Sequence, residues 1–232
     1  MSRSLKIAVV MNQREQAVGF VYLLLELFIL PSLLERLNAL LPMPLSSSWL
    51  NFLYFILNFA AVCILFRRFL RRCLAQAGRD VEGFLMVTIC GFVIYYLVNL
   101  VLTFAIRLLA PGFSNLNDGN LAQQIRSDYF VMALSTTLLV PVAEELLHRG
   151  LVFGSLYEKS PWVAYPVSTL LFASIHVLGY LNVYSPPHLL IAFVQYLPAG
   201  FALAWAYRRS GSIFSPILIH AAVNTLALLM LR

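Results

Sequence analysis

Two adjacent carboxylates, Glu144 and Glu145, lie inside an almost wholly hydrophobic stretch that runs from residue 129 to residue 157. Arg149 follows Glu145 by four residues, so the two share one helix face and can form an ion pair. An ionisable side chain at the centre of a membrane helix costs about 2.5–3.5 kcal/mol. These acids are therefore expected to pair, to line a wet cavity or to do chemistry, and one chemistry open to a carboxylate is proton transfer.

Two further pairs of polar or aromatic residues recur at the same spacing in later hydrophobic segments. Phe172 and His176 are four residues apart, and so are His220 and Asn224. Residues at this spacing lie on one face of a helix. Each pair can therefore present both of its side chains to a common site.

The positions of these residues along their segments predict that they meet at one depth. Glu144 lies fifteen residues before Lys159, and His176 lies fifteen residues after Pro161, on the other side of a short turn. In an antiparallel hairpin both are then about 22 Å from the turn, at a rise of 1.5 Å per residue. His220 lies about 17 Å into the last segment by the same measure. Glu, His, His and Asn side chains converging on one layer predict a catalytic site.

The whole chain predicts an all-α, polytopic membrane helix bundle with about seven transmembrane helices. Hydrophobic residues make up 61% of its 232 residues and charged residues 11%, with a mean hydropathy of +0.83. A soluble core of this size cannot bury so much apolar surface, whereas a bilayer can. The expected segments are residues 17–36, 49–66, 83–106, 129–158, 161–180, 188–207 and 211–231.

Basic residues are concentrated in every second connection between these segments, and these connections lie on one side of the membrane. The formal net charge is +6, and the arginines of residues 67–79 follow the second segment, with further basic residues near the start of the first and after the fourth and sixth. The positive-inside rule then places the N-terminus in the cytoplasm and the C-terminus outside. This pattern accounts for the charge without nucleic acid, which is not expected as a partner; the expected surroundings are the lipid bilayer.

Three other features carry weaker expectations. The first segment contains Glu26 and Glu35 and is expected to lie partly in the membrane interface. Residues 111–128 are expected to form mainly a solvated connector. Cys73, in the arginine-rich loop, is expected to be an inert thiol, and no cleavable signal peptide is evident.

The three spaced pairs, taken in order, resemble a known family. Glu-Glu-x-x-x-Arg (144–149), Phe-x-x-x-His (172–176) and His-x-x-x-Asn (220–224) are similar to the motifs of the CPBP family, the CAAX-processing and bacteriocin-processing (Abi) intramembrane endopeptidases of the glutamic type. The lead-in of residues 211–220 fits the third motif as well. The chain is accordingly divided into residues 1–128, N-terminal membrane helices without a motif, and residues 129–232, a CPBP/Abi-like catalytic core.

The resemblance implies an intramembrane endopeptidase of a bacterial cytoplasmic membrane, acting on a membrane-associated peptide or protein without a cofactor. It implies that Glu144 is the general base and that His176 orients the attacking water with it. It also implies that His220 and Asn224 form the oxyanion hole. The expected supporting residues are Glu145, Arg149 and Phe172, the last packing beside His176.

Three alternatives remain open. Glu144, Glu145, His176 and His220 could bind Zn²⁺ as mixed nitrogen and oxygen ligands, although the chain has no His-Glu-x-x-His motif. The protein could instead be a non-proteolytic scaffold or immunity protein that regulates a partner such as a sensor kinase. A transporter or proton relay would also place acids and histidines in the bilayer, but no repeated halves are visible. His148 lies outside the fixed motif positions and is expected to be structural.

Overall fold

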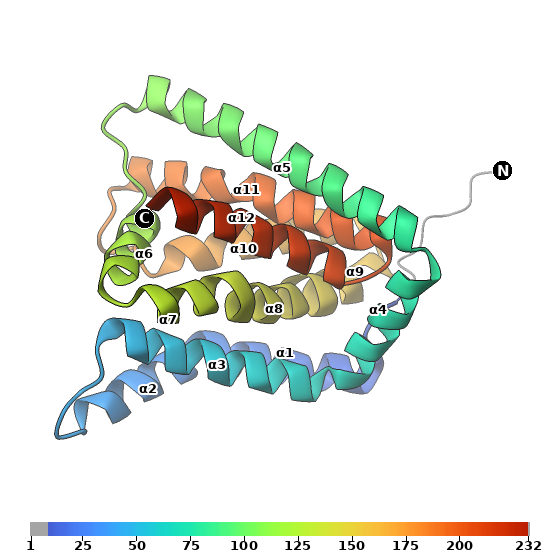
Figure 1. Ribbon diagram of the computed structural model, residues 1–232, viewed down its shortest axis with the longest axis horizontal. Coiled ribbons are helices and arrows are strands. Elements are labelled where there is room, and N and C mark those ends of the chain that lie inside the picture. Colours follow the sequence, from blue (N-terminus) through green and yellow to red (C-terminus); the bar gives the residue numbers. More distant parts are fainter. Residues whose placement is uncertain (1–8, 232) are drawn as a thin grey trace.

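The computed structural model describes residues 9–231, and every regular element among them is helical (Figure 1). In chain order the elements are α1 (Gln13–Phe28), α2 (Leu30–Ala39), α3 (Ser47–Leu65), α4 (Arg67–Arg79), α5 (Val81–Leu109), α6 (Leu116–Ser127), α7 (Tyr129–Leu134), η1 (Ser135–Leu139), α8 (Val140–Glu145), η2 (Leu146–Phe153), α9 (Gly154–Tyr157), α10 (Pro161–Leu178), α11 (Pro186–Ser210) and α12 (Phe214–Leu231). The elements η1 and η2 are π-helical and belong to one continuous helix from α7 to α9.

All seven predicted membrane segments are helices, close to their predicted bounds. Five described helices are long and apolar enough to cross a bilayer: α3, α5, the continuous helix α7–α9, α10 and α11. The first segment is the pair α1 and α2, bent by 44° near Ile29, and the last is the shorter apolar helix α12. The chain is therefore an all-α, multi-pass integral membrane protein.

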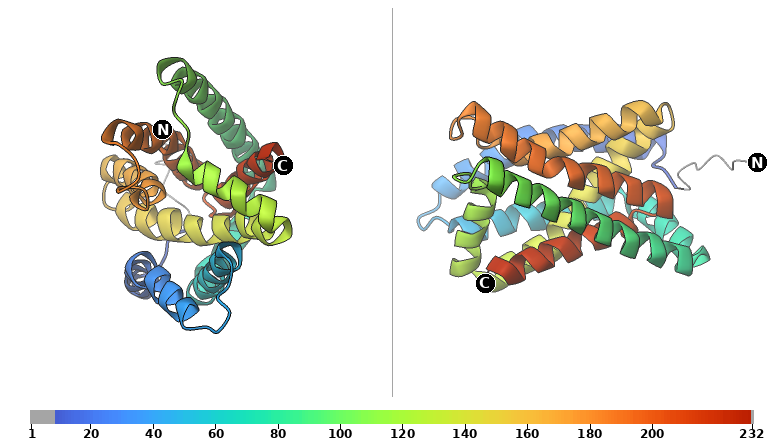
Figure 2. Two further views of the ribbon diagram at one scale, coloured as in Figure 1. Left: turned by 90° about the vertical axis from the view of Figure 1, so that its left-hand side faces the viewer. Right: turned by 90° about the horizontal axis from the view of Figure 1, so that it is seen from above.

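The helix α7–α9 lies in the middle of the bundle. On one side it packs against α1 and α3, and on the other against α10 and α12. Figure 2 shows it between these two groups, with α5 packed outside α11 and α12. The helix that carries Glu144 therefore has neighbours from both halves of the chain.

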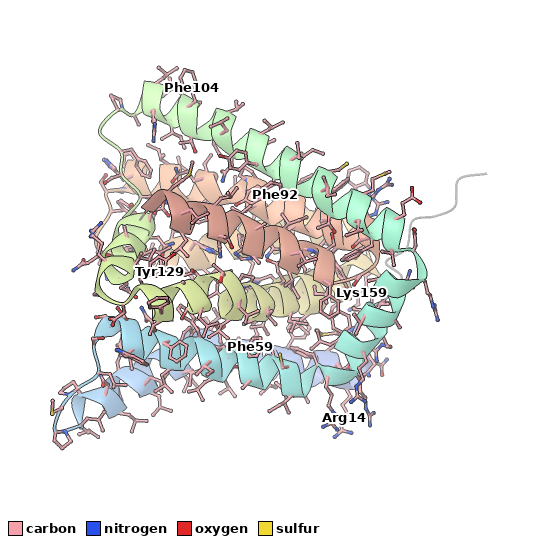
Figure 3. The ribbon with its side chains drawn as sticks, viewed as in Figure 1. Arg14, Phe59, Phe92, Phe104, Tyr129 and Lys159 are labelled. Carbon is pink, nitrogen blue, oxygen red and sulfur yellow. The ribbon has the colours of Figure 1, made fainter. Side chains whose placement is uncertain are left out.

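Most of the described basic residues gather at one end of the bundle. The helix α4 joins α3 to α5 there and buries Phe69 and Cys73, while most of its arginines face outwards. Figure 3 labels Arg14 and Lys159 at the same end. Residues 67–79 were expected to be an arginine-rich loop, but apolar residues recurring along one face make this segment a helix.

Residues 111–128 also differ from expectation. Instead of a connector without structure, most of this segment forms α6, whose Ala122 and Ile125 are buried. Asn115 caps the helix by accepting a hydrogen bond from the backbone N–H of Asn117, at 3.0 Å. This helix covers one end of the bundle near α11, so residues in it can reach the candidate site.

The two π-helical segments lie on either side of Pro141, a residue type that bends or loosens a helix. Proline has no backbone N–H, so it cannot continue the hydrogen-bond ladder of the helix. In η1 the backbone N–H of Val140 donates to the carbonyl of Ser135, five residues earlier. Short π-helical insertions are often found at functional sites, and here they flank both glutamates.

Candidate active site

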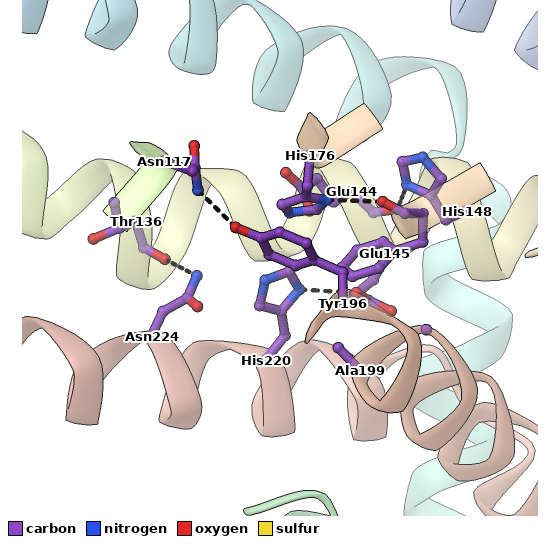
Figure 4. Close-up of polar contacts among 12 residues, drawn as sticks. Asn117, Thr136, Glu144, Glu145, His148, His176, Tyr196, Ala199, His220 and Asn224 are labelled. Carbon is purple, nitrogen blue, oxygen red and sulfur yellow. Dashed lines mark hydrogen bonds and ion pairs between the residues drawn. The ribbon is translucent and has the colours of Figure 1, made fainter. Parts of the chain in front are cut away.

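The first element of the site is a Glu–His pair between α8 and α10 (Figure 4). The Oε2 atom of Glu144 lies 3.9 Å from Nε2 of His176, and both side chains are partly exposed. The His176 Nδ1 donates to the backbone carbonyl of Phe172 at 2.8 Å, which fixes the ring tautomer. In the neutral ring, Nε2 is then a hydrogen-bond acceptor that faces the carboxylate.

The second element is a buried cluster centred on Glu145. Arg149 donates to Glu145 Oε1 at 2.9 Å, and both side chains are fully buried. The Nδ1 atom of His220 lies 2.8 Å from the same oxygen. Glu145 and Arg149 thus form the ion pair that their spacing predicts, and Figure 4 shows His220 bound to this second glutamate rather than to Glu144.

Arg149 also connects the cluster to the neighbouring helices. Its guanidinium carbon lies 4.0 Å from the centre of the Phe172 ring on α10. Its Nη2 lies 3.4 Å from the backbone carbonyl oxygens of Ala199 and Gly200 on α11. Phe172 itself lies 4.5 Å from the His176 ring, measured between ring centres. The buried pair therefore joins three helices around the two catalytic candidates on α8 and α10.

Asn224 is held by the irregular part of the central helix. Its Nδ2 donates to the backbone carbonyl of Thr136 at 2.8 Å. In the π pattern that joins Val140 to Ser135, this carbonyl would accept from residue 141, which is a proline without an N–H. Asn224 supplies the missing donor, and its second amide hydrogen remains available to another acceptor.

Tyr196 is a site residue that the sequence analysis did not identify. Its ring stacks on His176 with 4.3 Å between the ring centres. Its hydroxyl accepts hydrogen bonds from Asn117 at 3.2 Å and from Asn115 at 3.3 Å. The start of α6 thus holds Tyr196, which lies on α11, against one face of the His176 ring. Tyr196 lies on the segment predicted as 188–207, but no spacing rule connects it to His176.

A cavity of about 310 Å³ lies on the other side of α8, between it and α1, α3 and α10. Glu144 and His148 line it from the central helix, and Glu26, Tyr54 and Asn58 line it from the first 128 residues. His148 donates from Nδ1 to the backbone carbonyl of Glu144 at 2.8 Å. Glu144 therefore borders this cavity as well as approaching His176.

The four residues named as potential zinc ligands divide into two pairs. Glu144 lies beside His176, and Glu145 is bound to His220 and Arg149. Within residues 9–231, no group of three His, Cys, Asp or Glu side chains is arranged to hold a metal ion. Whether activity requires a metal ion can be tested by adding a chelator to the purified protein.

The sequence was compared with protein-family models and with curated proteins. Residues 126–226 match the family model described as type II CAAX prenyl endopeptidase Rce1-like. "Putative membrane peptidase YdiL" of Bacillus subtilis is 31% identical over 101 residues, which are 43% of this chain and 37% of that protein. UPF0177 protein YxdF of Lactococcus lactis is 32% identical over 87 residues, 38% of this chain and 42% of that protein.

The chain spans about two fifths of the length of these two relatives. A second lactococcal protein, UPF0177 protein YbdI, is 25% identical over 150 residues and is matched over 75% of its length. No solved structure matches the chain significantly. The matched region contains all three spaced pairs, so the family model supports the resemblance to the CPBP family that those pairs predict.

Proposed function

We propose that the protein is an intramembrane endopeptidase that hydrolyses a peptide bond in a membrane-associated protein or peptide. The observation that carries this proposal is the approach of Glu144 Oε2 to His176 Nε2, 3.9 Å apart at the edge of a membrane cavity. The match of residues 126–226 to a family model described as a type II CAAX prenyl endopeptidase supports the same reaction class. The bacterial relatives support a location in a bacterial cytoplasmic membrane.

The spacing of these two atoms suits a bridging water molecule. An oxygen atom about 2.8 Å from each, an ordinary hydrogen-bond distance, fits between atoms that are 3.9 Å apart. Both atoms accept hydrogen bonds, because Glu144 is a carboxylate and Nδ1 of His176 carries the proton of that ring. A water molecule donating to both keeps a lone pair free to attack a carbonyl carbon.

The proposed reaction has two steps. The water oxygen attacks the scissile carbonyl carbon while Glu144 takes its proton, and the carbonyl oxygen becomes an oxyanion. Glu144 then gives the proton to the amide nitrogen as the carbon–nitrogen bond breaks. The products are a carboxylic acid and an amine. No covalent intermediate with the protein is formed.

The remaining residues stabilise or position the reacting groups. In this proposal the second amide hydrogen of Asn224 and the Nε2–H of a protonated His220 donate to the oxyanion. Glu145 holds His220 through Nδ1, and Arg149 holds Glu145. Tyr196 and Phe172 fix the plane of the His176 ring. Catalysis needs no metal in this scheme, and activity is expected to survive a chelator.

The experiment that tests the function compares protein termini in a bacterial host. Wild type and Glu144→Ala are expressed at matched levels in a deletion strain, and membrane-associated terminal peptides are compared by mass spectrometry. A truncated terminus that is present with wild type and absent with Glu144→Ala is expected. That terminus also identifies the substrate, whether it is prenylated or unmodified.

The opposite result would favour a different class of protein. If the two profiles of terminal peptides are identical and Glu144→Ala restores the phenotype of the deletion strain, then proteolysis is not the function. The scaffold alternative, in which the protein regulates a membrane partner without cleaving it, would then replace the proposal.

A further inference from the structure

The cavity beside Glu144 contains a second carboxylate from the other half of the chain. Glu26, on α1, lines the cavity that Glu144 lines from α8. The hydroxyl of Tyr54, on α3, donates to Glu26 Oε1. The neighbouring Tyr22 donates in the same way to Asn58. Both hydrogen bonds join α1 to α3, and the one from Tyr54 holds the Glu26 side chain at the cavity.

The Glu26 carboxyl group has no basic partner nearby. Among residues 9–231, no Lys or Arg forms an ion pair with Glu26 or with Glu144. None of the described residues that line the cavity is Lys or Arg. Carboxylates within a membrane are costly, and they usually face a partner or a substrate path. Two carboxyl groups that line one cavity favour the binding of a positively charged group there.

His148 adds an independent observation that points to the same kind of occupant. Its side chain is only 2% exposed and lines the cavity. Because Nδ1 donates to the Glu144 carbonyl, Nε2 of the neutral ring is an acceptor. This Nε2 atom is buried and has no hydrogen-bond partner among the described residues. The Oε2 atom of Glu144 is also buried without a hydrogen-bond partner in the same part of the chain.

The free polar atoms contributed by these three side chains are thus all acceptors. Oε2 of Glu144 and Nε2 of His148 have no partner among the described residues, and the Glu26 carboxyl group, which accepts one hydrogen bond from Tyr54, can accept further ones. The ammonium of lysine and the guanidinium of arginine offer only donors, so they complement such a set. A hydrophobic wall from Leu27, Phe28, Phe55 and Leu147 suits the alkyl stem that either side chain carries.

We propose that this cavity is a substrate subsite for a lysine or arginine side chain, with Glu26 as the residue that binds its charge. The proposal rests on the endopeptidase function proposed above and narrows its substrate class. A cationic side chain bound here lies next to Glu144, so the scissile bond is close to the basic residue. Glu26 is a specificity residue, since the reacting atoms lie at Glu144 and His176.

The test profiles cleavage of a peptide library by the purified full-length chain in lipid nanodiscs. A proteome-derived peptide library is digested by wild type, Glu26→Gln, Glu26→Lys and, as the inactive reference, Glu144→Ala, and cleavage sites are identified by mass spectrometry. Glu35→Gln is the matched control, because Glu35 lies in the same bent span but is exposed and outside the cavity. The kinetics of one lysine-containing peptide and its norleucine analogue are then measured for each variant.

Wild type is expected to favour Lys or Arg at one position next to the cleaved bond. Glu26→Gln should reduce kcat/KM for the lysine peptide at least about tenfold, the loss of one hydrogen bond to a charged group, mainly through KM. It should leave the norleucine peptide unchanged within about twofold, which shows that the variant is folded. Glu26→Lys should shift the preference at that position to Asp or Glu, and Glu35→Gln should behave as wild type.

Two outcomes would overturn the inference, and they differ from failure of the function. One is Glu144-dependent cleavage by wild type without a preference for Lys or Arg, and the other is the same preference in wild type and in Glu26→Gln. Either result would show that the cavity does not select substrates by their charge. If Glu144-dependent cleavage is absent from wild type itself, the endopeptidase proposal fails, and the subsite fails with it.

Discussion

Replacing Arg149 by methionine removes the cation from a fully buried ion pair. The pair joins Arg149 to Glu145 at 2.9 Å, and neither side chain is exposed. After the substitution the Glu145 carboxylate stays buried with His220 as its remaining partner. Methionine has a similar length and is uncharged, so the loss measured is chiefly that of the cation and its hydrogen bonds.

The expected cost is about 3 kcal/mol of unfolding free energy, because breaking one side of a buried pair strands the other charge. That is a factor of about 150 in the ratio of folded to unfolded protein. The retained bond to His220 places the cost at the lower end of the usual range. The double variant Glu145→Gln with Arg149→Met removes both charges of the pair, and it should recover about 2 kcal/mol of this loss.

The assay is equilibrium unfolding in mixed micelles, followed by helical circular dichroism. The control is Arg72→Met, which breaks the ion pair with Glu15 at 2.8 Å, where the Arg72 side chain is 41% exposed. Its cost should be below about 1 kcal/mol. If Arg149→Met costs no more than this control, or if the double variant is less stable than Arg149→Met alone, the reasoning about the buried pair is wrong.

Three further predictions follow from single contacts. Pro141→Ala restores an N–H beside the Thr136 carbonyl, so it should release Asn224, seen as a changed Asn224 side-chain amide resonance in NMR spectra. Gly200→Ala should lower the melting temperature, because an added Cβ would lie 2.9 Å from the Thr169 backbone Cα on α10. Burial raises the pKa of the Cys73 thiol to about 12, so in a chain with Cys73 as its single cysteine, alkylation should remain slow from pH 7 to 9 and become fast only after unfolding.

For each of these three predictions, a specific result would contradict it. An unchanged Asn224 resonance in Pro141→Ala would show that the missing N–H does not hold this side chain. A Gly200→Ala variant as stable as wild type would mean that α10 and α11 can separate without cost. Alkylation of folded Cys73 that rises with pH as it does for a free thiol would contradict its burial.

The membrane segments could be predicted from the sequence because their signal is local. Each is a long apolar run, and helix length in a bilayer follows from the run itself. The convergence of Glu144 and His176 could be predicted too, since a short turn fixes the relative depth of two antiparallel helices. The pairing of Glu145 with Arg149 required only the four-residue spacing.

The features that were missed depend on contacts between distant segments. Nothing near Glu26 in the sequence indicates that it faces Glu144, because α1 and α8 meet only in the folded bundle. Tyr196 supports His176 across two helices. The bond from Asn224 to Thr136 depends on a π-helical turn, which apolar spacing does not reveal. The amphipathic helix α4 had a visible signal, its recurring apolar face, but its arginines were counted only as charges.

The most direct test of the central claim is the rate at which purified protein cleaves the peptide identified in the host. Glu144→Gln keeps the size of the side chain and removes its capacity to accept a proton. The account predicts that kcat falls at least about a thousandfold, while Glu35→Gln cleaves as fast as wild type. A Glu144→Gln variant that is folded and cleaves within about tenfold of the wild-type rate would contradict the role of Glu144 as the base.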